Sequence, residues 1–227
     1  MDYGVSLSME SVDNISKHKV SYCLYVGIKR VFDIFCALCG LIVLLPLSII
    51  VKIAYVITGD FNSVFYKQVR IGKNGKPFYM YKYRSMVKDA DKILEELLQQ
   101  KEYKEEWDQN QKLHDDPRIT KMGKFLRKTS LDEIPQFINV LKGEMSLIGP
   151  RPLVPGELDK HNGNHSIYER VRPGITSNWA VNGRSDEMEY SKRLKLEYDY
   201  VLNRSLAFDI KIIFKTIAVV LLRKGAK

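Results

Sequence analysis

Residues 31–57 read VFDIFCALCGLIVLLPLSIIVKIAYVI, and this apolar run decides how the rest of the chain is arranged. Only Asp33 and Lys52 carry charge within it. Because about 20 apolar residues cross the hydrocarbon core of a bilayer, the run predicts a membrane-inserted segment. It is longer than the apolar core of a secretory signal peptide, and no small-residue cleavage site follows it, so we do not expect it to be cleaved.

Pro46 lies in the middle of this run, where it removes one backbone hydrogen bond and bends a helix. Basic residues flank both ends: Lys17, Lys19, Lys29 and Arg30 come before the run, and Lys67, Arg70, Lys73 and Lys76 follow it. Since cytoplasmic loops are rich in Lys and Arg, both ends are expected on that side, as in a Pro-broken helical hairpin that enters and leaves the same leaflet. A single kinked helix that crosses the bilayer is the alternative, and sequence physics alone favours the crossing helix.

Asp33 is the acidic residue near the start of the run. Lys29 and Arg30 lie four and three residues before it, so a helix would pair their charges with its carboxylate. Cys36 and Cys39 have CxxC spacing, but in an apolar helix we interpret them as small packing residues rather than a redox or metal pair.

The composition limits the class of protein. The chain has 227 residues, of which 45% are hydrophobic and 28% charged, which excludes a disordered protein and allows one compact domain plus an appendage. Three cysteines do not make a disulfide scaffold. The net charge of +9 predicts an acidic partner, and at this stage nucleic acid, anionic lipid and phosphorylated small molecules are all candidates.

We divide the chain into a polar tail over residues 1–28, a membrane helix hairpin over 29–58 and a catalytic domain over 59–227. In the last of these, VFYKQVRI (64–71) and KPFYMYKYRSM (76–86) predict two strands joined by the turn GKNG. The expected fold class is α+β and mainly helical, with a small β-hairpin and a helical catalytic core.

Three further stretches predict helices and loops. The charged stretch 89–113 predicts one helix with a solvated face. The stretch GKFLRKTSLDEIPQFINVLKGEMSLIGPRPLVPGE (123–157) predicts a helix and then a proline-rich loop, and RPGITSNWAVNGRS (172–185) predicts a second loop.

The last 36 residues hold nine Lys or Arg but only three Asp or Glu. Within them, LAFDIKIIFKTIAVVLL (206–222) is apolar on most of its circumference, with Lys211 and Lys215 on one edge. This pattern predicts a basic amphipathic helix that lies in the plane of a membrane surface. A buried helix followed by a basic tail is the alternative.

The sequence Ser130-Leu131-Asp132-Glu133 has two interpretations. As a capping box, Ser130 would cap a helix and Glu133 would reach back to it. As a functional motif, two adjacent carboxylates at a helix N-terminus are suited to phosphate chemistry, because the free N–H groups there attract anions. Neighbouring helical residues point about 100° apart, so the two carboxylates would do different work.

Basic residues are frequent around this motif: Lys82 and Arg84 in YKYRSM, Arg127 in FLRKTS and Arg151 in GPRP. An arginine in a loop stiffened by prolines is suited to bidentate binding of a phosphate. Each of them alone is more often a surface charge than a phosphate ligand.

The second loop contains Trp179, Asn182 and Arg184, which could stack on and bind a base or sugar. The sequence has no Walker loop, no GxGxxG or GxSxG motif, and no His or Cys cluster with zinc spacing.

Together these segments resemble the bacterial sugar transferase family, membrane-associated phosphoglycosyl transferases that load a sugar phosphate onto polyprenyl phosphate. The resemblance runs from about residue 29 to the C-terminus. It rests, in order, on KRVFDI, the Pro46 segment, YKYRSM, LRKTSLDEIPQFINVLKGEMSLIGPRP, RPGIT and NGRS. The long central string is the most specific part.

The resemblance implies that the family's catalytic Asp-Glu pair falls on Asp132 and Glu133. Asp132 would attack the β-phosphate of a UDP-sugar, release UMP, carry the sugar phosphate covalently and bind Mg²⁺. Glu133 would deprotonate the incoming polyprenyl (undecaprenyl) phosphate. The transfer would initiate synthesis of a bacterial surface polysaccharide or glycoconjugate.

The resemblance also assigns binding residues. The family's phosphate-binding basic residues fall on Lys82, Arg127 and Arg151. Its nucleotide-proximal region falls on Trp179, Asn182 and Arg184, in a loop where Ala180 replaces the glutamine of many relatives.

The implied location is the cytoplasmic face of the bacterial inner membrane, with a re-entrant helix broken at Pro46 and the catalytic domain resting on the lipid surface. Many relatives have Ser-Pro at the break, whereas this chain has Leu45-Pro46. We therefore expect Ser48 or a water molecule to satisfy the backbone groups that proline frees.

The implied partners are a UDP-sugar, polyprenyl phosphate and inner-membrane lipid, with no nucleic acid and with a homo-oligomer left open. A competing hypothesis from another class is a non-catalytic basic membrane module that recruits partners or nucleic acid to anionic lipid. It accounts for the charge and the apolar run, but it gives no role to the two carboxylates.

Overall fold

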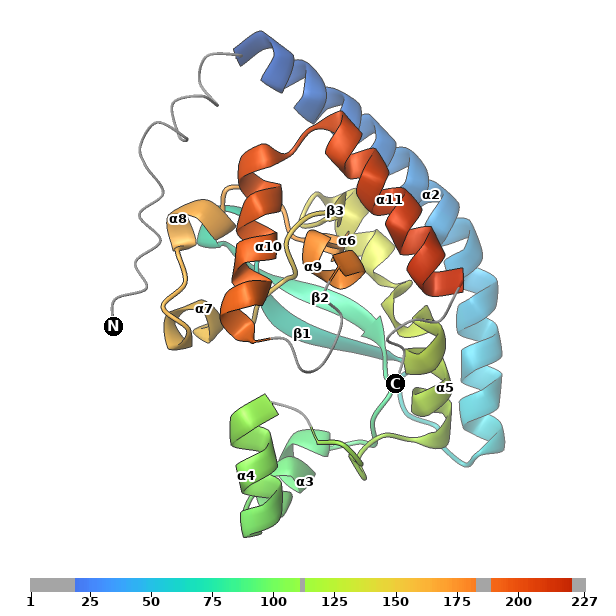
Figure 1. The fold of residues 1–227 in the computed structure, drawn as a ribbon. Coiled ribbons are helices and arrows are strands. Elements are labelled where there is room, and N and C mark those ends of the chain that lie inside the picture. The colour runs from blue at the N-terminus through green and yellow to red at the C-terminus, as the bar shows by residue number, and fades with distance from the viewer. Residues whose placement is uncertain (1–18, 111–112, 183–188, 222–227) are drawn as a thin grey trace.

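The computed structural model describes residues 19–110, 113–182 and 189–221, and helices dominate it (Figure 1). The predicted α+β, mainly helical class is confirmed. In chain order the elements are α2 (Lys19–Ile57), β1 (Phe65–Ile71), the 3-10 turn η1 (Lys73–Gly75), β2 (Pro77–Tyr83), α3 (Ala90–Leu97), α4 (Lys101–Asn110), α5 (Lys121–Thr129), the 3-10 turn η2 (Leu131–Glu133), α6 (Gln136–Lys142), β3 (Ser146–Ile148), α7 (Glu157–Lys160), α8 (His165–Tyr168), β4 (Gly174–Thr176), α9 (Asn178–Asn182), α10 (Tyr190–Asn203) and α11 (Leu206–Leu221).

Helix α2 is one element of 39 residues that curves along one side of the protein (Figure 1). It begins at Lys19, so its first turns overlap the polar tail that was predicted over residues 1–28, while residues 1–18 lie outside the described chain. The predicted break at Pro46 needs correction, because the helix continues through this residue as one curved element instead of separating into two arms.

Two hydroxyl groups bond to a carbonyl close to Pro46. Ser48 Oγ donates to the carbonyl of Leu44 at 2.7 Å, and the Tyr83 hydroxyl of β2 donates to the same carbonyl at 3.2 Å. The carbonyl that loses its helical donor because of Pro46 is that of Ile42, four residues earlier. The prediction that Ser48 satisfies the freed group is therefore not confirmed, because its hydroxyl bonds to Leu44 instead.

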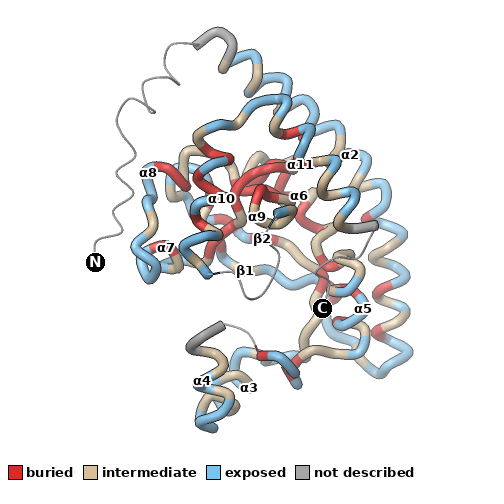
Figure 2. Tube along the Cα trace, viewed as in Figure 1, coloured by how far each residue is buried: buried red, intermediate tan, exposed pale blue. Residues whose placement is uncertain are grey.

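The outer face of α2 is apolar and exposed. The helical segment Tyr22–Ile57 is long and apolar enough to cross a membrane. Only 17% of its most apolar 18-residue stretch is buried within the protein. Val31, Phe35, Ile42 and Leu45 are exposed on this face, and Figure 2 shows exposed residues along the length of the helix. Proteins rarely expose so large an apolar surface to water, which supports contact with lipid.

The inner face of α2 packs on the rest of the protein. Leu44, Val51 and Tyr55 form a buried cluster with residues of β2 and α5. Ala37 belongs to a second buried cluster with residues of β2 and α6. Burial of these side chains stabilises the attachment by roughly 1.5–3 kcal/mol for each large one.

Two buried aspartates tie α2 to the domain by polar contacts. Asp33 accepts hydrogen bonds from Ser146 Oγ at 3.1 Å and from the Leu147 N–H at 3.0 Å. Lys29 Nζ lies 3.9 Å from Asp33 and 3.4 Å from Asp209 of α11. The predicted pairing of Lys29 with Asp33 is confirmed.

Arg30 was also predicted to pair with Asp33, but it does something else. Its guanidinium donates to the carbonyls of Val140 and Leu141 at 2.7 and 3.0 Å. The last carbonyls of a helix lack partners within the helix and attract cations, so the end of α6 provides the better site.

Helix α11 is amphipathic, as predicted. Leu206, Phe214 and Ile217 are exposed, whereas Ile212 is buried in the main core cluster. Lys211 is exposed. The last basic residues of the chain, at 223, 224 and 227, lie outside the described part.

The predicted hairpin is present as β1 and β2, which pair in antiparallel fashion. Tyr66 lies opposite Lys82, and Arg70 lies opposite Phe78. Residues that lie opposite each other in the hairpin share a face, and so does every second residue of one strand. Lys82 therefore shares its face with Tyr66 and, four residues further along β1, with Arg70. Four residues correspond to about 13 Å along a strand. A second small sheet pairs β3 with β4 in parallel.

The stretch 89–113, predicted as one helix, forms two. Helices α3 and α4 are separated at residues 98–100 and project away from the body (Figure 1). Neither Gly nor Pro marks this break, so local propensity does not reveal it.

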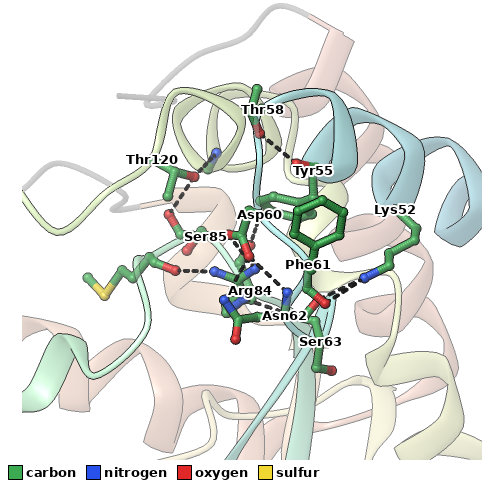
Figure 3. Close-up of polar contacts among 12 residues, drawn as sticks. Lys52, Tyr55, Thr58, Asp60, Phe61, Asn62, Ser63, Arg84, Ser85 and Thr120 are labelled. Carbon is green, nitrogen blue, oxygen red and sulfur yellow. Dashed lines mark hydrogen bonds and ion pairs between the residues drawn. The ribbon is translucent and has the colours of Figure 1, made fainter.

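Arg84 holds the junction between the end of α2 and the hairpin (Figure 3). Its guanidinium donates to the carbonyls of Ser63 at 2.8 Å and Met86 at 3.1 Å, and pairs with Asp60 at 2.7 Å. It also lies 4.7 Å from the ring centroid of Tyr55, whose hydroxyl donates to the Arg84 carbonyl. The sequence grouped Arg84 with candidate phosphate-binding residues, but these contacts give it a structural role.

We expect Arg84→Met to lower the free energy of unfolding by about 2 kcal/mol, because two carbonyls and the Asp60 carboxylate lose their partner. Chemical denaturation of the full chain in lipid nanodiscs measures the change. Lys101→Met is the control, since its ion pair with Glu105 is exposed and should contribute less than about 0.5 kcal/mol. Equal losses in both variants would contradict the structural role.

Candidate active site

A tight turn after α5 places Asp132 and Glu133, called here the carboxylate pair. Helix α5 ends at Ser130, whose N–H donates to the Arg127 carbonyl at 3.1 Å. The backbone of Ser130 is left-handed, with φ of 56°, and η2 begins at the next residue. The chain thus reverses direction immediately before the carboxylate pair.

The capping-box interpretation of Ser130 and Glu133 is therefore wrong. Ser130 stands both at the end of α5 and directly before η2, but its side chain makes no cap hydrogen bond, and its N–H donates to the Arg127 carbonyl. The Glu133 carboxylate lies 2.9 Å from Lys82 Nζ of β2. A left-handed non-glycine residue costs of order 1–3 kcal/mol, and such strain is concentrated at functional sites.

Lys82 and Arg127 bring positive charge to the carboxylate pair. Lys82 Nζ lies 2.9 Å from Glu133 Oε1 and 3.8 Å from Asp132 Oδ2. Arg127 is half-buried, its Nε donates to Ser85 Oγ at 2.9 Å, and its charge favours the ionised form of Asp132. Four of the residues predicted from the sequence therefore form one site.

The two carboxylates differ in environment. The Asp132 side chain is 12% exposed, whereas the Glu133 side chain is 37% exposed. Burial raises the pKa of Asp132 above its usual value and Glu133 adds to this, while Lys82 and Arg127 oppose the shift. A carboxylate shielded from water but beside cations is suited to attack an electrophilic centre, and the more exposed one is suited to exchange protons.

The site is attached to the exposed apolar helix. Leu131 and Ile134, on either side of the carboxylate pair, pack against the cluster that contains Leu44 and Val51 of α2. Leu44 lies two residues before Pro46, so the turn is seated against the C-terminal half of α2. Chemistry at this turn would take place close to the surface that α2 presents to lipid.

Arg151 belongs to a second group, called here the arginine cluster (Arg70, Arg151, Arg193 and Glu157). Within the described part of the chain, the ion-pair partner of Arg151 is Glu157 at 3.0 Å, not the carboxylate pair. Glu157 also receives Arg193 Nη2 at 3.3 Å and the Tyr190 hydroxyl at 3.1 Å. Arg70, on the same face of the hairpin as Lys82, reaches the carbonyl of the residue after Arg151 at 3.1 Å.

Comparison with known proteins shows the family of the chain. The family model described as bacterial sugar transferase matches residues 24–223. The chain belongs to the bacterial sugar transferase family.

Relatives of this sugar transferase carry informative names. An undecaprenyl-phosphate galactose phosphotransferase of Salmonella typhimurium is 46% identical over 200 residues, which are 88% of this chain and 41% of that protein. The exopolysaccharide production protein ExoY of Sinorhizobium fredii is 43% identical over 199 residues, 87% of each chain. A UDP-glucose:undecaprenyl-phosphate glucose-1-phosphate transferase of Escherichia coli is 37% identical over 199 residues, 84% of this chain and 39% of that protein. This chain thus spans about four-tenths of the length of the Salmonella typhimurium and Escherichia coli relatives.

Two of the predicted nucleotide-proximal residues of the transferase, Trp179 and Asn182, lie on the short helix α9 but make different contacts. Trp179 borders the arginine cluster, because the Arg193 guanidinium lies 4.6 Å from the centroid of its ring. Asn182 instead donates to the Asn178 carbonyl at 3.0 Å and accepts from Lys215 of α11. Arg184 lies outside the described residues.

Sequence reasoning missed most of the surroundings of Arg151. Arg70 was noted only as a flanking charge, and Glu157, Arg193 and Glu197 were not singled out. They come from β1, α7 and α10, which are far apart in the sequence. Of these residues, Glu157 is the one close to Arg151 in the sequence. Its carboxylate accepts a hydrogen bond from the N–H of Val154, three residues earlier, at 3.0 Å.

The carboxylate pair of the transferase fits Mg²⁺ by its chemistry. Mg²⁺ is commonly held by one or two carboxylates together with water and substrate phosphates. Asp132 and Glu133 both approach one nitrogen of Lys82, so their oxygens converge on a common volume. Among the described residues no larger cluster of three His, Cys, Asp or Glu side chains forms a metal site.

Proposed function

We propose that this transferase moves a sugar 1-phosphate from a UDP-sugar to polyprenyl phosphate, such as undecaprenyl phosphate, and releases UMP. The observation that carries the proposal is the buried Asp132 carboxylate beside Lys82 and Arg127, on a turn seated against an exposed apolar helix. Relatives named for undecaprenyl-phosphate transfer and exopolysaccharide production support it. The product would be the first lipid-linked intermediate of a bacterial surface polysaccharide or glycoconjugate.

In the first half-reaction, an oxygen of Asp132 attacks the β-phosphorus of the donor. A bond forms between this oxygen and the phosphorus, and the bond from the phosphorus to the oxygen that bridges to the α-phosphate breaks. The electron pair of the broken bond leaves with UMP. Lys82 and Arg127 offset the negative charge on the phosphoryl oxygens during this step.

In the second half-reaction, an oxygen of polyprenyl phosphate attacks the phosphorus of the aspartyl-phosphosugar. The bond to Asp132 breaks and the carboxylate is restored. Glu133 accepts the proton of the incoming phosphate and passes it to water, which its greater exposure permits. Dividing the transfer into two steps lets a water-soluble donor and a lipid acceptor use one small site in turn.

Mg²⁺ held by Asp132 would offset the charge of the donor pyrophosphate and stabilise the leaving group. Arg151, toward the other end of the same hairpin face, would bind a phosphate of the donor. Trp179, beside the arginine cluster, is then placed to contact the nucleotide end.

The exposed apolar faces of α2 and α11 would hold the site at the cytoplasmic surface of the inner membrane. We propose that the curved, unbroken α2 enters and leaves the bilayer through the same leaflet, which leaves both of its ends on that side. We then expect a tag at Met1 to resist protease added from the periplasmic side. Removal of the tag would show that the helix crosses the bilayer.

Release of UMP tests the proposed activity directly. The full chain in nanodiscs is incubated with a panel of UDP-sugars, Mg²⁺ and polyprenyl phosphate, and the nucleotide product is identified by chromatography. UMP is expected, and UDP as the only product would contradict the proposal. Salt-dependent lipid binding without turnover of any donor would favour the non-catalytic membrane module.

The pH dependence of kcat/KM should report the burial of Asp132. Only the ionised carboxylate attacks, and its pKa is raised, so activity should fall with decreasing pH at values above the usual pKa of aspartate. Lys82→Met removes a charge that lowers this pKa, so the acidic limb should move to still higher pH, together with a loss of rate.

Lys67→Met is the control for this measurement, because Lys67 is exposed on the opposite face of the hairpin. The acidic limb of kcat/KM for the Lys67→Met variant should match that of the unmodified enzyme. A limb that moves to lower pH in Lys82→Met, or equally in both variants, would contradict the assignment of Asp132.

A further inference from the structure

The loop that carries Arg151 is held along its whole backbone. Every residue from Ile148 to Val154 has a backbone hydrogen bond to another part of the protein. The contacts are Tyr200 Oη to Ile148 O (3.2 Å), Gly149 N to Thr176 O (3.1 Å), Gly174 N to Pro150 O (2.9 Å), Arg151 N to Glu197 Oε1 (3.2 Å), Tyr168 Oη to Arg151 O (2.8 Å), Arg70 Nη1 to Pro152 O (3.1 Å), Ile71 N to Leu153 O (2.9 Å) and Val154 N to Glu157 Oε2 (3.0 Å). A loop bound in this way presents Arg151 in one orientation.

Two carboxylates accept the hydrogen bonds that Arg151 donates. Glu197 of α10 accepts from its N–H, and Glu157 of α7 accepts from its guanidinium at 3.0 Å. Glu157 is fixed in turn by Arg193 and Tyr190 of α10. Backbone and side chain of Arg151 are therefore restrained by separate groups.

A glutamate at position 197 is expected to lower the stability of the fold. It is 0% exposed, and its neighbours on α10 include the buried Tyr198, Tyr200 and Val201. Burial raises its pKa to about 7, against the influence of Ser177, Arg151 and Arg193. A buried carboxyl in an apolar core usually destabilises a fold relative to an apolar side chain of similar size.

Unsatisfied polar atoms gather at the same place. Four buried side-chain atoms lack a hydrogen-bond partner in the described residues: Arg70 Nε, Trp179 Nε1, Arg193 Nε and Glu197 Oε2. Arg70 and Glu197 contact the Arg151 loop directly, Arg193 contacts Glu157, and Trp179 lies against Arg193. Buried polar groups are normally paired, so a concentration of exceptions points to function.

We propose that Glu157 and Glu197 are positioning residues that hold Arg151 ready for a phosphate of the nucleotide-sugar donor. Glu197 fixes the loop backbone, and Glu157 fixes the guanidinium. The inference rests on the proposed function, because it takes the donor of that reaction as the ligand. Neither carboxylate touches the reacting atoms.

Equilibrium binding of UDP-glucose and UDP-galactose to the full chain in nanodiscs tests the proposal. The measurements use an Asp132→Asn background, so that no donor is consumed. Glu197→Leu should weaken binding by about tenfold, because loss of the acceptor lets the loop move by a fraction of an ångström. Glu197→Gln retains an acceptor oxygen, so its Kd should stay within about twofold of the parent.

Thermal unfolding separates positioning from a structural role. Glu197→Leu removes a buried carboxyl that is costly to the fold but leaves the Arg151 N–H without its acceptor, so Tm should change little while binding weakens. A lower Tm with unchanged Kd would overturn the proposal, and so would equal weakening in the leucine and glutamine variants.

The role of Glu157 is tested by a double-mutant cycle that combines its substitution with one at Arg151. Glu157→Gln should raise Kd by about tenfold in the parent but have no further effect when combined with Arg151→Met, because its influence passes through that side chain. Additive effects would overturn its role. Asp159→Asn, an exposed carboxylate on the same short helix α7, is the matched control and should leave Kd unchanged.

This cycle also distinguishes failure of the proposed function. If the donors bind and the cycle behaves as expected, but the unmodified enzyme releases no UMP, the proposed reaction is wrong and the positioning of Arg151 stands. If neither donor binds to the parent, the positioning proposal is wrong.

Discussion

Asp132→Asn is expected to reduce UMP release at least about 1,000-fold, because a neutral amide cannot form the covalent phosphosugar. The substitution keeps the size of the side chain in a site that is only 8% exposed, so the fold should be retained. Initial rates of UMP release measured with the full chain in nanodiscs give the result. Asp115→Asn, with a side chain that is 92% exposed, is the control and should retain normal rates.

The covalent step has a signature of its own. With UDP-sugar but no polyprenyl phosphate, the unmodified enzyme should accumulate a hexose-phosphate adduct on the peptide that contains Asp132. Glu133→Gln should still form this adduct, since Glu133 is assigned to the second half-reaction. An adduct on another residue, or an active Asp132→Asn enzyme, would rule out the covalent route.

Gly123→Ala is expected to lower the free energy of unfolding by about 3 kcal/mol and to reduce UMP release as well. A Cβ at Gly123 would lie 1.8 Å from the carbonyl oxygen of Ser85, a backbone atom that cannot rotate away. Helix α5 would have to move from the end of β2. Because Arg127 on α5 donates to Ser85 Oγ, the movement would also displace a charge from Asp132.

Gly27→Ala is the matched control for this prediction. Gly27 lies inside α2, and a Cβ there would meet no atom within 4 Å. Alanine in an open helical position should stabilise the protein by about 0.5–1 kcal/mol relative to glycine. Similar losses of stability in both variants would show that the close approach at Gly123 is unimportant.

Much of the fold could be predicted because its signals are local. The apolar run, the strand–turn–strand pattern ending at Tyr83 and the apolar stripe of α11 each follow from the spacing of residues close together in the chain. The predictions that failed were also local. Ser130 follows the end of α5, where its N–H donates to the Arg127 carbonyl. Arg30 donates to carbonyls at the end of α6, far away in the sequence, instead of pairing with Asp33.

The candidate site could be predicted in part. Asp132, Glu133, Lys82 and Arg127 were identified from sequence motifs and lie together in the structure. Arg151 was identified by the same means, yet its partners Glu157, Arg193 and Glu197 carry no sequence pattern. Arg184 lies outside the described residues, so its assignment stays a prediction.

From residue order one can read which segments are apolar, which are extended and which carry the reactive side chains, since hydrophobic periodicity and turn chemistry act over a few neighbouring positions. Residue order does not show that Lys82 meets a carboxylate fifty positions later, that Asp132 is shielded from water, or that α10 supports the Arg151 loop. Those properties arise when distant elements pack together, because burial and charge proximity exist only in the assembled fold. They decide which of the many charged side chains can do chemistry.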